Sequence, residues 1–248
     1  MTEALTVSAV QYQALDGGII PNVQEHVRLI EDAESHGARL VVFPGLSLTG
    51  SNLALLTEED SWLRPDDARL DDLHEICRRT GITAVAGAAY REPDGTPRMA
   101  CLAIHPDGTM EAGFKARLNG VEEQHFTAGA GAIFLEMDGW RIAVVICSDG
   151  EDPAHCTAAE LAGMDACAVS AVYAHDDERR LALHLEALAS ENRMFGILAN
   201  LAGSTPSGLS FGSSGFWGPD GLQLRKAAGT GTEVVTAILQ RSALRKFR

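Results

Sequence analysis

The sequence predicts an α/β protein in which mixed β-sheets are covered by layers of helices, an α+β layered arrangement. Amphipathic helical segments alternate with short apolar strands near both ends of the chain, whereas strands joined by tight turns fill its middle. No linker, low-complexity tract or short repeat interrupts the 248 residues. This order of elements is typical of sheets layered with helices, and we predict a single domain over residues 1–248.

The first third of the chain predicts a strand and a helix, followed by a second strand and helix. Residues 5–12 alternate as a strand does. A helix should begin near Asn22, where Glu25 completes a capping-box pattern, and its apolar face and end are marked by Val23, Val27, Ile30, Ala33 and Gly37. A short buried strand is expected over 40–43. The second helix is expected over 67–80, with acids early and arginines late, as the helix dipole favours.

Strands dominate the rest of the chain. Three Pro-Asp-Gly turns separate apolar runs, as in hairpins, and a further hairpin is centred on Asp138-Gly139. Helices are expected over 157–162 and 178–192. We predict strands over residues 83–90, 99–105, 109–115, 133–137, 140–146, 166–173, 195–201, 210–217 and 233–239.

Composition excludes several classes of function. The formal net charge is −14, with 34 acidic against 20 basic residues, which disfavours nucleic-acid and anionic-membrane partners. No apolar run approaches the length of a membrane span, and the N-terminus lacks the basic region of a signal peptide. The five cysteines show no CxxC or zinc spacing. These features predict reduced thiols and a cytoplasmic protein without a metal site.

A cysteine at the end of a predicted buried strand is the first candidate for chemistry. The segment WRIAVVICSD places Cys147 directly after an apolar run and before a polar turn. In α/β proteins, reactive groups commonly lie at the carboxyl ends of core strands. Free cysteine is also among the most buried residues, so packing alone is the alternative interpretation.

Three further stretches carry polar groups at the ends of predicted strands and helices. They are VVFPGLSLTG, residues 41–50, GFKARLNGVEEQHFTAG, residues 113–129, and ENRMFGILAN, residues 191–200. Together with the cysteine segment, and with FGSSGFWGPDG behind the last block, they resemble the nitrilase, or carbon–nitrogen hydrolase, superfamily. The blocks match in order and approximate separation over residues 5–240, nearly the whole chain. Any one block is a weak signal, whereas four in order are a specific one.

The resemblance implies an αββα sandwich that pairs with a second subunit across its helical layers, hence a homodimer. It implies hydrolysis of small amides, nitriles or carbamoyl compounds by side chains and water, with no cofactor. Carried over by position, Cys147 is the nucleophile, Lys115 stabilises the oxyanion, and Glu122 is the second glutamate because it lies four residues before Phe126. Glu123 takes that place if the alignment shifts by one.

Further positions follow from the same blocks. Ser148, Asp149 and Asn200 are expected to contact the substrate. Ser148 stands where many members have an aromatic residue, and Asp152-Pro153-Ala154 stands for their usual Phe-Pro-Glu. The Asp149-Gly150 and Pro153 pattern is closer to the aliphatic-amidase-like members than to the nitrile-specific ones.

The main departure lies in the first block. The family has a glutamate, its general base, directly after Phe-Pro, and this chain has Gly45. A shifted alignment does not explain the glycine, because the rest of the block matches the family: Phe43, Pro44, Leu46, Ser47, Thr49 and Gly50. Proton transfer by a positioned base contributes roughly 10²–10⁴-fold to a rate. We expect impaired turnover, and a void at residue 45 that water could enter.

Two hypotheses of different classes follow. In the first, the chain is an amidase of a small linear substrate, either weakened by Gly45 or carrying a substitution of an active parent. In the second, it is a catalytically silent member that binds a small amide or acyl compound or serves as a scaffold subunit. Retention of Cys147, Lys115 and Glu122 favours the first. A Cys147–His155 dyad is a third possibility, which no other feature of the sequence supports.

Overall fold

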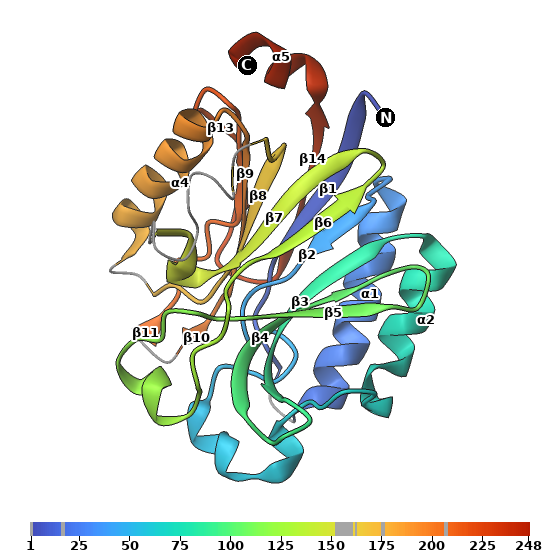
Figure 1. Ribbon diagram of the computed structural model, residues 1–248, viewed down its shortest axis with the longest axis vertical. Helices are drawn as coiled ribbons and strands as arrows, with labels where there is room; N and C mark the ends of the chain where they lie inside the picture. The colour runs from blue at the N-terminus through green and yellow to red at the C-terminus, as the bar shows by residue number, and fades with distance from the viewer. Residues whose placement is uncertain (1, 16–17, 152–160, 162, 175–176, 206–207) are drawn as a thin grey trace.

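Two six-stranded sheets packed face to face form the centre of the molecule (Figure 1). The computed structural model describes residues 2–15, 18–151, 161, 163–174, 177–205 and 208–248. One sheet has the strand order β14-β1-β2-β3-β4-β5, and the other has the order β13-β12-β9-β8-β7-β6. The predicted layered α/β class is confirmed, with described helices on the outer face of each sheet.

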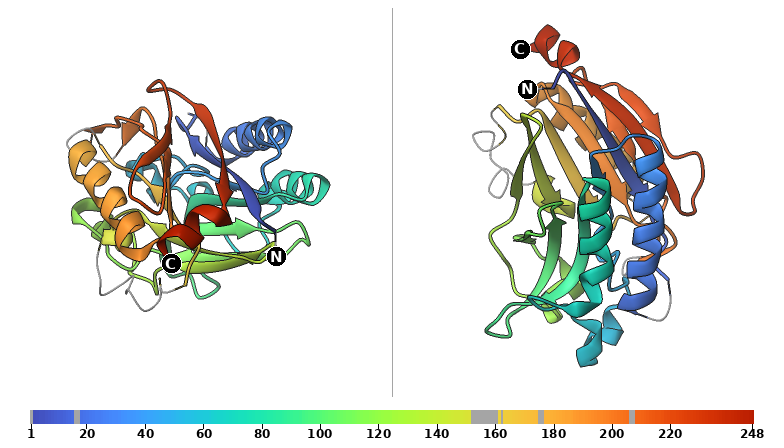
Figure 2. Two further views of the ribbon diagram at one scale, coloured as in Figure 1. Left: turned by 90° about the horizontal axis from the view of Figure 1, so that it is seen from above. Right: turned by 90° about the vertical axis from the view of Figure 1, so that its right-hand side faces the viewer.

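The first sheet contains most of the N-terminal half of the chain. Strands β1, β2 and β3 are parallel, and β3, β4 and β5 form an antiparallel meander. Helices α1 and α2 lie side by side on its outer face, as Figure 2 shows. The bounds of these elements are β1 Ala4–Gln11, α1 Ile19–Ser35, β2 Leu40–Val42, α2 Asp71–Thr80, β3 Thr83–Arg91, β4 Pro97–Ile104, β5 Met110–Phe114 and β14 Glu233–Gln240.

The second sheet has a parallel centre made of β7, β8 and β9, with antiparallel neighbours on both sides. Helix α4 covers its outer face, on the side of the molecule opposite to α1 and α2 (Figure 1). Its elements are β6 Ile133–Met137, β7 Trp140–Ile146, β8 Ala166–Ala171, α4 Glu178–Asn192, β9 Phe195–Asn200, β12 Gly215–Trp217 and β13 Gln223–Lys226.

Short elements complete the described chain. A two-stranded hairpin joins β10 and β11 beside the main sheets, and α5 follows β14. Their bounds are η1 Leu53–Thr57, η2 Glu59–Ser61, η3 Ala68–Leu70, η4 Gly120–Gln124, η5 Cys147–Glu151, β10 Ser204–Thr205, β11 Gly208–Leu209 and α5 Arg241–Phe247. No helix in the described ranges combines the length and apolarity that crossing a bilayer requires.

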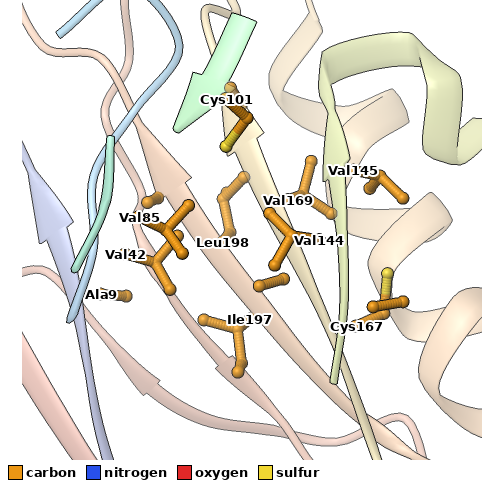
Figure 3. Close-up of a cluster of buried hydrophobic side chains, with 14 of the residues drawn as sticks. Ala9, Val42, Val85, Cys101, Val144, Val145, Cys167, Val169, Ile197 and Leu198 are labelled. Carbon is orange, nitrogen blue, oxygen red and sulfur yellow. The ribbon is translucent and has the colours of Figure 1, made fainter. Parts of the chain in front are cut away.

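The larger hydrophobic core fills the space between the two sheets. Figure 3 shows small and branched side chains of β1, β2 and β3, such as Val42 and Val85, facing Val144, Val169 and Leu198 of the second sheet. Burying apolar area stabilises by about 25 cal/mol per Å², so this layer is the main source of stability. A second core lies between the first sheet and α1 and α2.

Several sequence predictions differ from the structure, and some elements were not predicted. Helix α1 begins at Ile19, not near Asn22, because the Asn22 side chain is buried in the first turn, where it bonds Tyr12, Leu15 and Gly18. The strand predicted over 210–217 shrinks to β12. Ahead of β12, Ser210 and Ser214 bond the side chains of Asn200 and Gln11, at the ends of β9 and β1. The strand β13 and the helix α5 were not predicted. The helix expected over 157–162 lies almost wholly outside the described residues.

Candidate active site

Cys147 stands at the carboxyl end of β7, where the sheet gives way to η5. Its backbone adopts a left-handed φ of 47°, a conformation that non-glycine residues seldom adopt outside functional sites or turns. The side chain is 5 % exposed. The amide N–H of Val172, just past the end of β8, donates to Sγ over 3.2 Å. The thiol is therefore held at the ends of two neighbouring parallel strands.

Lys115 follows β5 directly and reaches the same place from the other sheet. Its side chain is 2 % exposed, and Nζ donates to both carboxylate oxygens of Glu122 at 2.7 and 2.6 Å. Glu122 also accepts the backbone N–H of Asn119 at 2.9 Å. A buried ammonium requires such a partner, and the contact fixes the direction in which Nζ points.

The charges around the thiol act in opposite directions. Burial raises the pKa of Cys147 to about 11, while Lys115 lowers it and Glu122 raises it further. Burial alone would lower the pKa of Lys115, but Cys147, Glu122 and Asp149 outweigh burial and raise it. Near neutral pH the site therefore holds a charged lysine beside a thiol that keeps its proton.

Asp149 connects the two strand ends that carry the cysteine and the lysine. Its carboxylate is fully buried and accepts the backbone N–H groups of Ala116 and Arg117, each at 2.8 Å. Two charge-assisted bonds of this kind are stronger than neutral ones. They hold the segment after β5 against the segment after β7, and so place Lys115 relative to Cys147. Asp149 is not among the residues that line the pocket described next.

A pocket of about 410 Å³ opens over Cys147 and Lys115. Such a volume suits a small organic ligand. Besides Cys147, Lys115 and Glu122 it is lined by both apolar and polar or charged residues: Leu46, Leu53, Met99, Val121, Val172, Arg117, Asn119, Gly120, Ser148, Tyr173, Asp177 and Arg180. Among them, Arg180 pairs with Asp177 over 2.7 Å. Asp177, Arg180 and Val172 were not predicted as site residues, because nothing in their local pattern marks them as facing a pocket.

Gly45 lies beside this pocket with no room left for a side chain. A Cβ built on it would come within 2.7 Å of Val172 Cγ2 and 3.5 Å of Met99 Cε. The void that the glycine was expected to leave is therefore absent, since Val172 fills it. The structure brings Glu122 to Lys115, whereas Glu123 is exposed.

The three predicted substrate contacts occupy different surroundings. Ser148 lines the pocket, and its Oγ lies 2.9 Å from Asn119 Nδ2. Asn200 is fully buried at the end of β9, where Oδ1 accepts the N–H of Tyr173 at 2.9 Å and Nδ2 donates to the carbonyl of Gly212 at 2.9 Å. It supports the loop that carries Tyr173, a residue that lines the pocket. Asp152-Pro153-Ala154 and His155 lie outside the described residues.

The described side chains offer no metal site. Within the described ranges no group of three or more His, Cys, Asp or Glu residues is arranged to hold a metal ion. What the pocket does present is a buried thiol, a buried ammonium and a carboxylate bound to it. This set suits addition of sulfur to a carbonyl or nitrile carbon, with the ammonium next to the charge that develops.

Comparison with known proteins places the chain in a family. A sequence model of the family described as carbon-nitrogen hydrolase matches residues 6–248, and the chain belongs to that family. It is 26 % identical over 220 residues to a formamidase of Bacillus cereus, which covers 87 % of this chain. It spans 66 % of the length of that formamidase.

Solved structures share the fold at lower identity. Nit3 of Saccharomyces cerevisiae, a nitrilase-superfamily member, superposes with a TM-score of 0.89 at 18 % identity, covering 100 % of this chain and 94 % of Nit3. A mutant of the amidase from Nesterenkonia sp. AN1, carrying acrylamide added to its active-site cysteine, superposes at 0.84 and 23 % identity, with 98 % and 96 % covered. The predicted αββα sandwich of nitrilase type is confirmed.

Proposed function

We propose that this chain is an amidase-type hydrolase of small linear amides, with Cys147 as nucleophile and turnover limited by Gly45. The observation that carries the proposal is the buried Lys115–Glu122 pair beside a buried thiol at the base of a small pocket. A buried ion pair is weak evidence for a stabilising role. Its position beside a nucleophile therefore favours a catalytic role. The curated formamidase relatives support an amide substrate.

The proposed reaction uses the charges of the site in sequence. Sγ of Cys147 bonds to the carbonyl carbon, and the carbonyl electron pair moves to oxygen, where the Lys115 ammonium stabilises it. The C–N bond then breaks and ammonia leaves with the proton that the thiol gave up, which produces a thioester. Water hydrolyses the thioester to a carboxylic acid and restores the thiol. Glu122 holds Lys115 charged and oriented throughout.

The two proton transfers are the steps for which this site offers no general base. The thiol must lose a proton and a water must later be activated, but residue 45 offers no carboxylate. Both oxygens of Glu122 are bound to Lys115, and Asp149 is bound to backbone N–H groups. We therefore expect turnover to be lower by roughly 10²–10⁴-fold than with a base in place.

Ammonia release from formamide, acetamide and propionamide tests the proposal, with Cys147→Ala as the control. Slow release by the unaltered chain and none by the variant supports it. Intact-mass measurement after incubation with acrylamide reports the nucleophile separately, because Michael addition needs no hydrolytic base. Adduct on the unaltered chain but not on Cys147→Ala shows a competent thiol. Equal ammonia release by both proteins would overturn the assignment of the nucleophile.

The second candidate is a silent member that binds an amide or acyl compound, or acts as a scaffold. Two observations favour it: the Val172 side chain occupies the space that a side chain at residue 45 would need, and the pKa of Cys147 is raised. An absence of both ammonia release and acrylamide adduct, in a protein that is folded by circular dichroism, would favour it. We further propose a cytoplasmic homodimer, which light scattering after gel filtration tests through the mass of the particle.

A further inference from the structure

The peptide group between Ala171 and Val172 lies between Gly45 and the thiol. Its carbonyl, on Ala171, accepts the N–H of Gly45 at 3.2 Å. Its N–H, on Val172, donates to Cys147 Sγ at 3.2 Å. A peptide unit is planar and rigid, so any displacement on the Gly45 side is passed to the bond that reaches the sulfur.

The segment that carries Gly45 cannot retreat from Val172. On its other side lies Gly87, where an added Cβ would stand 2.5 Å from Gly45 Cα and 2.4 Å from Leu46 N. Backbone bonds fix the segment as well, since Gly87 N–H donates to the Pro44 carbonyl at 3.2 Å and Leu48 N–H to the Gly87 carbonyl at 2.9 Å. Relief of a contact at residue 45 must therefore come from Val172.

Val172 can give way in two ways, because it is half-buried and lines the pocket. Its Cγ2 would lie 2.7 Å from a Cβ at residue 45, well inside van der Waals contact. A β-branched side chain has few accessible rotamers, so turning into the pocket is restricted and the backbone shifts as well. Because the Val172 N–H is bonded to Sγ, a shift of this residue lengthens the one backbone bond given to the thiol by β8.

We propose that Gly45 and Val172 act as one positioning unit for the Cys147 thiol. The peptide group between Ala171 and Val172 couples the backbone of residue 45 to Sγ, and the Val172 side chain occupies the space of a side chain at 45. Two consequences follow. Any side chain at 45 disturbs the thiol, and a carboxylate can be placed there only when residue 172 is smaller.

A double-variant cycle tests the coupling without any substrate. The proteins are the unaltered chain, Gly45→Ala, Val172→Ala and the double variant, each measured for Tm and for the rate of iodoacetamide alkylation at Cys147 at pH 8. The charged groups acting on this thiol are Lys115, Glu122 and Asp149, the buried Cys101 interacts with it electrostatically, and all four proteins retain them. Alanine at 172 keeps the N–H group.

We expect Gly45→Ala to lower Tm by roughly 3–10 °C and to slow alkylation at pH 8 by about 10-fold. The double variant should return the rate to within about twofold of the unaltered chain, because the clash is gone and the N–H remains. Gly231→Ala is the matched control, since its Cβ meets nothing within 4 Å. It should change neither quantity.

Two results would overturn the proposal. An unchanged alkylation rate in Gly45→Ala, whatever its Tm, would mean that Val172 only packs. A slower rate that persists in the double variant would mean that Val172 does not transmit the effect. A second comparison rests on the proposed amide hydrolysis: Gly45→Glu combined with Val172→Ala should release ammonia at least 10-fold faster than Gly45→Glu alone. If neither protein releases ammonia while the alkylation rates of the cycle are as expected, the proposed function is contradicted and the positioning unit stands.

Discussion

At the scale of single residues, the chemistry of the pocket depends on one ion pair. Lys115 is charged although buried because Glu122 bonds it twice, and its charge is what lowers the pKa of Cys147 against the effect of burial. Removing either partner changes the charge that the thiol experiences. The two partners therefore have opposite expected effects on the thiol.

Lys115→Ala is expected to slow alkylation of Cys147 at pH 8 by at least about 10-fold, because the thiolate then faces the Glu122 carboxylate alone. It should also destabilise the fold by about 1–3 kcal/mol, since the partly buried Glu122 carboxylate loses its partner. Lys115→Ala combined with Glu122→Ala serves as the control and should recover part of both losses. Stopped-flow alkylation and urea unfolding measure the two effects. An unchanged alkylation rate in Lys115→Ala would contradict the electrostatic account.

The raised pKa of Cys147 gives a second expectation at this scale. Only the thiolate reacts, and with a pKa of about 11 its population rises about tenfold per pH unit below that value. The alkylation rate should therefore climb steadily from pH 7 to pH 10 without levelling. Measurement uses the intact folded protein, with Cys147→Ala to subtract the other cysteines. A plateau below pH 9 would show that Lys115 outweighs burial.

At the scale of elements, the ends of strands decide where the site forms. Cys147, Lys115 and Val172 follow β7, β5 and β8 respectively. Pairing of β7 with β8 brings Cys147 and Val172 together, and packing of the two sheets brings Lys115 to them. The ends of β7 and β5 could be predicted from the sequence, because apolar runs stop abruptly there. The position of Val172 could not, since the predicted strand ran on to residue 173 and β8 ends at Ala171. The early start of α1 was missed because Asn22 bonds groups outside its own helix.

Asp149 is the link between two of these strand ends, and its removal tests whether the link matters. Asp149→Ala leaves the N–H groups of the buried Ala116 and of Arg117 without their acceptor, which should lower the free energy of unfolding by about 1–3 kcal/mol. Asp149→Asn retains one acceptor oxygen and should lose about half as much. Both should slow acrylamide addition in the same order, because Lys115 is no longer held against Cys147. Full adduct formation by Asp149→Ala at the unaltered rate would show that Lys115 is positioned by Glu122 alone.

At the scale of the whole molecule, buried titratable groups limit the pH range of stability from both sides. Burial raises the pKa of Cys77 and of Cys101 to about 12. Above about pH 8.5 the unfolded chain loses these protons and the folded chain keeps them, so stability falls as pH rises. On the acid side the relevant group is His26, whose pKa burial lowers to about 3. Maximum stability is therefore expected near neutral pH.

His26 joins helix α1 to the segment behind the active site. It is fully buried, its ring nitrogens lie 2.7 Å from the Asn22 carbonyl and 2.9 Å from Ser47 Oγ, and it stacks on Phe43 at 4.0 Å. Between about pH 6.5 and pH 3 the unfolded chain binds a proton at this residue and the folded chain does not. The free energy of unfolding should consequently decrease as the pH falls, by up to about 1.4 kcal/mol per pH unit from this group.

His26→Gln removes that proton while keeping groups that can bond Asn22 and Ser47. We expect it to be less stable than the unaltered chain at pH 7, by about 1–3 kcal/mol, because packing against Phe43 is lost. The difference in free energy of unfolding between the two proteins should become smaller as the pH is lowered from 6.5 to 4.5, since only the unaltered chain has a histidine to protonate on unfolding at this position. Urea unfolding at intervals across this range measures this difference. His36→Gln, at an exposed residue just after the same helix, is the matched control for replacing a histidine by glutamine. A constant difference between His26→Gln and the unaltered chain would show that His26 takes up its proton without unfolding, and that the contact between α1 and Ser47 opens locally instead.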